Sequence, residues 1–118
     1  MLNIFLLIFI ITQFFNNNIK LINANDAKNK IKNIYFKNII DVRTKNEYKL
    51  GNHPKSINLP IEPINNLTYD NLKKFNRNDP ILIYCRSGRR AFNAAKILKK
   101  KFNFKKIYYI NSTYKSII

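Results

Sequence analysis

The chain contains a single cysteine, Cys85, and it opens the basic segment 85–90, which reads CRSGRR. A thiol acts as a nucleophile in its thiolate form, which nearby cations and helix amides stabilise. A lone cysteine is also commonly a small buried apolar residue. Because three arginines follow Cys85 within five positions, we interpret it as the candidate catalytic nucleophile.

The residues after Cys85 suit an anionic sulfur or a bound oxyanion. Gly88 allows the backbone to curl without a side-chain clash. A helix that begins near Arg90 directs the unpaired amides of its first turn toward the cysteine sulfur. Arginines at a helix N-terminus oppose the helix dipole, so placing three there costs stability and indicates a site. The predicted substrate-binding residues are Arg86, Ser87, Gly88, Arg89 and Arg90.

The elements that position this loop alternate between strands and helices. Residues 80–84 (PILIY) form a continuous apolar run of strand length that ends at Cys85, as in a central parallel strand. Apolar residues then recur at three- and four-residue steps from Ala91 to Phe102, which predicts an amphipathic helix. Further strands are predicted at 34–36 with 39–42, at 57–60 and at 107–110, and further helices at 26–32, at 44–50 and within 63–75.

This order of elements predicts an α/β fold, a small open parallel sheet of about four to five strands with helices on both faces. Ligands of such sheets bind at the carboxyl ends of the strands. Cys85 directly follows the most apolar strand and is therefore expected at that edge. With 118 residues, the chain has room for one domain.

The N-terminal segment predicts export. Residues 2–15 are apolar apart from three polar positions, and Ala24 is small enough to precede a cleavage site. The apolar core of about a dozen residues is shorter than the ~20 needed to cross a bilayer. We therefore expect a cleaved signal peptide at 1–24, a folded domain at 25–118, and a periplasmic or otherwise exported location. No Lys or Arg precedes the apolar run, so anchoring by an uncleaved segment is the alternative.

The net charge of +16 raises the question of a polyanionic partner. Lysines are scattered through the chain, with one dense run at 99–106, and they accompany many isoleucines and asparagines, as an A+T-rich coding sequence would produce. We therefore expect no specific nucleic-acid partner and a membrane contact only if the N-terminal segment is uncleaved. The positive charge still predicts attraction of small anions.

Three motifs stand in order along the chain: Asp41-Val42-Arg43 after a strand, residues 51–60 (GNHPKSINLP) and residues 84–91 (YCRSGRRA). Together they resemble a single-domain rhodanese, a thiosulfate sulfurtransferase, over roughly residues 34–112. An export segment followed by one compact domain is similar to the periplasmic rhodaneses of the phage-shock type.

The resemblance implies a ping-pong reaction without a cofactor or metal. Cys85 attacks the outer sulfur of thiosulfate, releases sulfite and holds a persulfide until cyanide or a thiol accepts the sulfur. The loop arginines bind the sulfonate, and Ser87 with the loop amides binds the persulfide. Asp41 and Arg43 support the end of their strand. The implied partners are a small anionic sulfur donor and a thiol or cyanide acceptor, and we expect a monomer.

Two other functions fit parts of the pattern. Cysteine phosphatases and arsenate reductases place an arginine after five intervening residues, but that position is Ala91 in this chain, and Arg90 comes after four. The shorter ring has room for sulfur rather than for a tetrahedral phosphate. A non-enzymatic rhodanese-like binding module is the other alternative, although such modules often lack the cysteine.

His53 is the only histidine, and paired with Cys85 it would indicate a papain-like hydrolase. It stands beside Pro54 in a turn, so we expect an exposed loop residue rather than a catalytic base. One histidine and one cysteine predict no metal site. The chain departs from the family at 51–56, where a second glycine is lost, and at 112–113, where Ser-Thr replaces paired glycines. These departures concern packing near the site and hence turnover.

Overall fold

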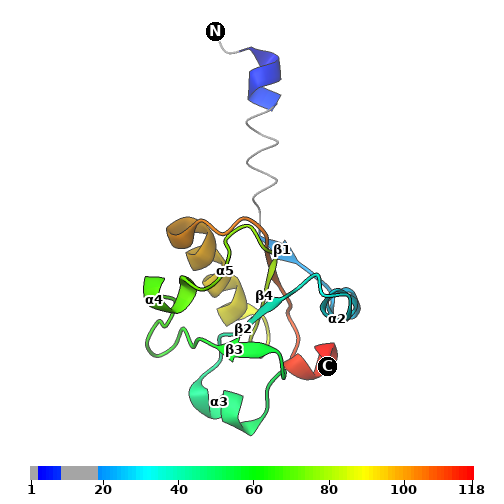
Figure 1. The fold of residues 1–118 in the computed structure, drawn as a ribbon, viewed down its shortest axis with the longest axis vertical. Helices are drawn as coiled ribbons and strands as arrows, with labels where there is room; N and C mark the ends of the chain where they lie inside the picture. Colours follow the sequence, from blue (N-terminus) through cyan, green and yellow to red (C-terminus); the bar gives the residue numbers. More distant parts are fainter. Residues whose placement is uncertain (1–2, 9–18) are drawn as a thin grey trace.

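Five short strands pair in parallel in the computed structural model, which describes residues 3–8 and 19–118. Their order across the sheet is β1-β5-β4-β2-β3 (Figure 1). The strands are β1 (Lys20–Leu21), β2 (Asn38–Asp41), β3 (Ser56–Asn58), β4 (Ile81–Tyr84) and β5 (Ile107–Tyr109). The helices are α2 (Ala24–Lys32), α3 (Lys45–Leu50), α4 (Tyr69–Leu72), α5 (Arg89–Phe102) and the 3-10 helix η1 (Tyr114–Ile117). The predicted α/β fold with an open parallel sheet is confirmed.

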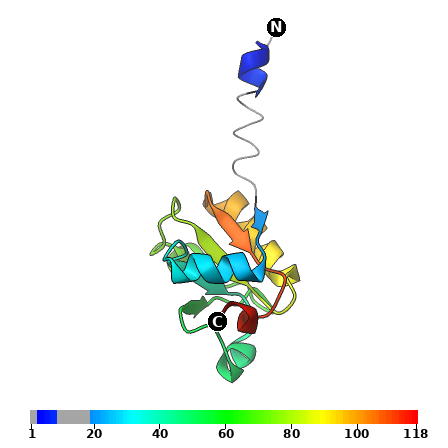
Figure 2. The same cartoon turned by 90° about the vertical axis from the view of Figure 1, so that its right-hand side faces the viewer.

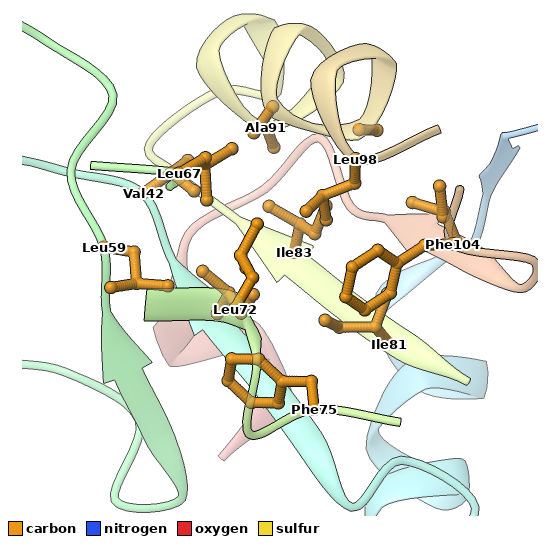
Figure 3. Packing of buried hydrophobic residues seen from close by; sticks show 14 of the residues in the cluster. Val42, Leu59, Leu67, Leu72, Phe75, Ile81, Ile83, Ala91, Leu98 and Phe104 are labelled. Atoms are coloured by element: carbon orange, nitrogen blue, oxygen red, sulfur yellow. The ribbon is translucent and has the colours of Figure 1, made fainter. Parts of the chain in front are cut away.

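Each face of the sheet is covered by helices, as Figure 1 shows for α5 and α2. Successive residues of a strand point to opposite faces, and β4 supplies both cores because all four of its residues are buried. Ile81 and Ile83 pack with α4 and α5 on one face (Figure 3). Leu82 and Tyr84 pack with α2 and η1 on the other. The most apolar strand is therefore the central one.

Helix α5 leads away from the candidate site, and its sequence explains its extent. Gly88 is its N-cap, and Ala91, Ala94, Ala95 and Leu98 form the buried stripe. Asn103 ends the helix in the left-handed conformation, with φ 60°, which asparagine adopts more readily than most residues. The small alanines allow the helix to lie close against the sheet, so the loop before it is held firmly.

Helix α3 begins with the capping box that the sequence predicts. The hydroxyl of Thr44 accepts a hydrogen bond from the Glu47 amide, and the Glu47 carboxylate accepts one from the Thr44 amide. Gly51 follows the last turn. This short helix stands at the carboxyl end of β2 and fixes Glu47 beside the candidate site.

Two predicted elements differ in the structure. Residues 34–36 are not a strand: Ile34 has φ 63° and lies in the turn that closes α2. The helix predicted within 63–75 is reduced to the single turn α4. Before it, Asn66 donates its side-chain amide to the Pro60 carbonyl, and such side-chain bonds compete with helix formation.

Strand β1 was not predicted, and it extends the folded unit toward the N-terminus. Ile22 is buried and donates its amide to Tyr109 in β5. Asn23 caps α2 by accepting from the Asp26 amide. The folded unit thus includes residues that precede the predicted boundary at 25.

The predicted export segment lies largely outside the described residues. Of its apolar part, residues 4–8 are described, and they are helical. In the part of the chain that the structure describes, no helix is both long and apolar enough to cross a bilayer.

Candidate active site

Cys85 follows β4 directly, at the carboxyl edge of the sheet, and its thiol is free and buried. Its Sγ accepts hydrogen bonds from the amide of Gly88 at 3.1 Å and from the amide of Ala91 at 3.4 Å. Both amides belong to the start of α5, where backbone donors have no partner within the helix. The loop therefore offers the sulfur two donors suited to an anionic or persulfide sulfur.

Gly88 is required by the shape of this loop. Its φ of 108° lies in a region that other residues rarely adopt. A Cβ at this position would also lie 3.0 Å from both Cα and Cβ of Asn111, just after β5. The glycine allows the loop to pack against that segment while its amide points at Cys85.

A cavity of about 370 Å³ opens beside Cys85. It lies between the cysteine loop, the end of α3 and the C-terminal segment. Its polar lining includes cations on two sides, Arg86 from the loop and Lys115 from η1. The lining residues are Arg43, Glu47, Leu50, Gly51, Cys85, Arg86, Thr113, Tyr114 and Lys115. A small anion fits both the volume and the charge of this cavity.

The three loop arginines have different surroundings. Arg86 is exposed and lines the cavity. Arg89 turns away from it and forms an exposed ion pair with Glu62 at 3.0 Å. Arg90 pairs with Glu47 at 2.6 Å and is mostly buried. Two of the three predicted sulfonate ligands are therefore already bound to carboxylates of the chain.

The pair of Arg90 and Glu47 links the loop to α3. Both guanidinium nitrogens donate to the carboxylate, at 2.6 and 3.0 Å. These hydrogen bonds lower the pKa of Glu47 to about 2. Because Glu47 also completes the capping box of α3, Arg90 attaches the loop to this helix and is not free to bind a ligand.

Ser87 lies on the outside of the loop. Its side chain is exposed and does not line the cavity. Within the described residues, its hydroxyl makes no hydrogen bond. The observed donors to Sγ are backbone amides, and the predicted contact of Ser87 with a persulfide stays a prediction.

Asp41 and Arg43 form a buried ion pair at 2.7 Å. The Asp41 carboxylate also accepts the Arg43 amide at 2.8 Å. Arg43 donates to the Gly51 carbonyl at 2.7 Å, and its guanidinium lies 5.0 Å from the ring centre of Tyr114. The pair thus ties the end of β2 to the turn after α3 and to the C-terminal segment, while Arg43 also lines the cavity.

His53 is buried, so the prediction of an exposed position is wrong. Its Nδ1 accepts the Lys55 amide, and its own amide donates to the Tyr84 hydroxyl. Burial is the main cause that lowers the pKa of His53. His53 does not line the Cys85 cavity, because the turn closes over the imidazole and uses it for packing.

The C-terminal segment contributes cavity residues that are not among the predicted site residues. Thr113, Tyr114 and Lys115 line the cavity, and Leu50 adds an exposed apolar rim. A Cβ at Gly51 would collide with the Tyr114 hydroxyl. Gly51 was therefore the sequence signal for close packing at this turn. The residue that packs against it, Tyr114, lies far along the chain and could not be inferred from the motif. Ser112-Thr113 replaces the paired glycines of the family, but the segment still packs on the domain, because Ile117 of η1 is buried.

In residues 3–8 and 19–118, no group of three or more His, Cys, Asp or Glu side chains is arranged to hold a metal ion.

Known proteins are similar to this chain in sequence and in fold. The sequence profile described as "Rhodanese-like domain" matches residues 23–117. A Bacillus subtilis protein, YrkF, named as a candidate sulfur carrier, is 35% identical over 80 residues, covering 68% of this chain and 40% of that protein. A candidate mitochondrial thiosulfate sulfurtransferase of Schizosaccharomyces pombe is 35% identical over 71 residues, covering 52% of this chain and 50% of that protein.

The solved structure of a rhodanese-like domain protein from Staphylococcus aureus has a TM-score of 0.67 and 27% identity, covering 84% of this chain and 91% of that one. The chain spans half or less of the length of the two curated relatives. Their names support sulfur transfer in general, while the likeness to the phage-shock type stays a prediction. Because the family profile covers the chain from the start of α2 to the end of η1, this protein belongs to the rhodanese-like domain family.

Proposed function

We propose that the chain is a sulfurtransferase that carries sulfane sulfur as a persulfide on Cys85. The observation that carries this proposal is the pair of amides, from Gly88 and Ala91, that donate to Sγ beside an anion-sized cavity. Such donors stabilise negative charge on sulfur before and after transfer. The names of the family relatives support the same chemistry.

The first half-reaction is a displacement on sulfur. The Cys85 thiolate attacks the outer sulfur of thiosulfate, a new S–S bond forms, and the bond to the sulfonate sulfur breaks. Sulfite leaves with the bonding electron pair, and Cys85 becomes a persulfide anion. Arg86 and Lys115, which line the cavity, offset the charge of the donor and of the departing sulfite.

In the second half-reaction, the acceptor attacks the outer sulfur of the persulfide. Cyanide yields thiocyanate, and a thiolate yields a persulfide of its own. In both cases the electron pair of the broken S–S bond returns to Cys85 as thiolate, so no oxidant or cofactor is consumed.

Cys85→Ser tests this proposal directly. The wild-type chain should form thiocyanate from thiosulfate and cyanide and gain about 32 Da after thiosulfate alone, the mass of one sulfur atom. The Ser variant should lose both signals while keeping the fold, because an oxygen replaces a sulfur of similar shape. A wild-type chain without the adduct and without thiocyanate would favour the non-enzymatic binding module instead.

A phosphatase or arsenate reductase is disfavoured by the same loop. Arg90, the arginine nearest to the phosphate-binding position of those enzymes, is bound at 2.6 Å to Glu47. It is therefore committed to a carboxylate. Hydrolysis of p-nitrophenyl phosphate that depends on Cys85 would reverse this preference.

The location and the oligomeric state belong to the same proposal. We propose that the protein is exported, which the apolar residues 2–15 support, and that it is a monomer. A cut after Ala24 would remove β1, the buried Ile22 and the Asn23 cap, whereas a cut before Lys20 would keep them. The mass of the mature N-terminus, together with light scattering of the purified chain, tests both points.

A further inference from the structure

Six exposed cations gather at the amino-terminal edge of the sheet, the end opposite the Cys85 cavity. Lys20 opens β1, and Lys106 immediately precedes β5. The Lys106 carbonyl accepts the Ile81 amide at 2.9 Å, and the Lys105 amide donates to the Arg77 carbonyl at 3.0 Å, so these turns lie side by side. Helix α5 ends beside them. We call Lys20, Arg77, Lys100, Lys101, Lys105 and Lys106 the amino-edge surface.

The charge of the amino-edge surface is not neutralised by acids. Within the described residues, none of its six members forms an ion pair with a carboxylate. Lys20 lies over the ring of Tyr108, and Lys105 donates to the neutral side chain of Asn103. Asp79, which is half-buried, is the acid carried by the turn before β4. The surface therefore presents a net positive field toward solvent.

The same edge is where the apolar N-terminal segment joins the domain, because residue 20 begins β1 there (Figure 2). The helical residues 4–8 are all apolar, and their side chains are between 47% and 77% exposed. In the chain that keeps residues 4–8, this exposed apolar helix and the lysine cluster supply two signals that together hold a protein on an anionic bilayer, whereas a chain cut before Lys20 keeps the lysine cluster alone.

A groove at this corner combines both kinds of contact. It has a volume of about 350 Å³ and is lined by Ile19 and Phe92 together with Lys96, Lys99 and Lys100. Apolar side chains beside lysine ammonium groups match the boundary between lipid chains and phosphate headgroups. A nucleic acid would use the lysines but would leave the apolar residues and residues 4–8 without a contact.

We propose that the amino-edge surface docks on an anionic lipid bilayer and turns the Cys85 cavity away from it. Strand β4 runs from this edge to Cys85, and its four residues span roughly 13 Å. The cavity is lined by residues of α3, and α3 stands at the far end of the molecule from β1 (Figure 1). Water-borne donors and acceptors therefore reach the cavity of the docked protein. The proposal does not depend on sulfur transfer.

Vesicle co-sedimentation of the full chain tests this docking. Vesicles of phosphatidylcholine alone are compared with vesicles that contain about 30% phosphatidylglycerol. The edge variant is K100Q/K101Q/K105Q/K106Q, and the control is K28Q/K45Q/K49Q/K55Q, which removes the same charge from exposed lysines elsewhere. At low salt, we expect the edge variant to lose on the order of a thousandfold in affinity for the anionic vesicles. The control should lose about tenfold or less, and thermal melting should show both variants folded.

Three results would contradict the proposed docking. Two concern affinity for anionic vesicles: an equal loss of affinity in both variants, or no loss in the edge variant. The third is tighter binding of the full chain to duplex DNA than to anionic vesicles at the same salt. The orientation has its own readout, since Cys85 is the single thiol. A polar maleimide should modify the vesicle-bound chain as fast as the free chain, and protection by vesicles would contradict the proposed orientation.

Discussion

The two ends of the parallel sheet hold their positive charge in different ways. At the carboxyl end, Arg43, Arg89 and Arg90 each bind a carboxylate, two of them in mostly buried pairs. At the amino end, the amino-edge surface has no carboxylate partner within the described part of the chain. Three of the six acidic residues of the chain thus form ion pairs at the end of the sheet that carries Cys85.

This difference shows what the acids do in so basic a chain. Asp41 and Glu47 fix arginines in place, and those arginines hold the turn after α3 and the cysteine loop. Arg86 is left to face the cavity, since it forms no ion pair within residues 3–8 and 19–118. The paired arginines therefore support the structure of the candidate site. The cations without a carboxylate partner, Arg86 at one end and the amino-edge surface at the other, are available to attract anions.

Asp41→Asn should give the largest effect on stability, because it leaves Arg43 buried without its carboxylate. Removing one partner of a buried pair costs about 3–5 kcal/mol. Urea unfolding should show a loss of this size. The control is Asp79→Asn at the amino end, where we expect about 0.5 kcal/mol or less. Equal losses in the two variants would mean that the carboxyl end is not held by its ion pair.

Arg86→Ala should lower kcat/KM for thiosulfate about tenfold, equivalent to about 1.4 kcal/mol, because it removes a cation that faces the anion. The matched control is Arg89→Ala, which removes the same charge from the neighbouring exposed pair with Glu62. Steady-state kinetics with thiosulfate and cyanide measures both. A larger loss for Arg89 than for Arg86 would contradict the division between paired and cavity-facing arginines.

Much of the fold was predictable because its signals are local. The apolar run before Cys85 predicted the central strand, and the alanine spacing after it predicted α5. Strand β1 was missed because a two-residue edge strand has no periodicity, and Lys20–Leu21 is defined only by pairing with β5. The helix expected within 63–75 was lost to asparagine side chains that bond the backbone, an outcome that depends on loop geometry.

The site was predictable in part for the same reason. Cys85 and Gly88 contact each other within one short loop, and a sequence shows such a local arrangement directly. The partners of Arg89 and Arg90 lie 27 and 43 positions away, so the sequence could not show that these arginines are occupied. Tyr114 and Lys115 reach the cavity only because the C-terminal segment folds back over Gly51, a contact between distant parts of the chain.

Glu47→Gln should cost about 1 kcal/mol at pH 7, since the side chain is 32% exposed and solvent screens its pair with Arg90. Gln still completes a capping box, so the change isolates the ion pair. The pKa of Glu47 is lowered from its ordinary 4.5 to about 2. Its contribution is therefore fully present above pH 4.5 and is lost as the pH falls toward 2.

Urea unfolding of the wild-type chain and of Glu47→Gln at several pH values measures this dependence. The difference between the two should shrink as the pH falls below 4.5. The control Glu62→Gln removes the same charge from the exposed pair with Arg89 and should show no measurable difference. If the loss of stability in Glu47→Gln stays constant down to pH 2, the loss comes from packing and not from the ion pair with Arg90.

The smallest effect is expected at the amino end, where K100Q/K101Q/K105Q/K106Q should change the free energy of unfolding by about 0.5 kcal/mol or less. Two opposing terms produce this result. Lys100 and Lys101 lie in the last turn of α5, where positive charge favours the helix dipole. The same lysines repel Lys105 and Lys106 across the adjoining turn. Added salt screens both terms, so urea unfolding at low and high salt should give nearly the same difference from wild type. A loss above about 1 kcal/mol would show that these lysines, like the arginines of the carboxyl end, hold the fold together.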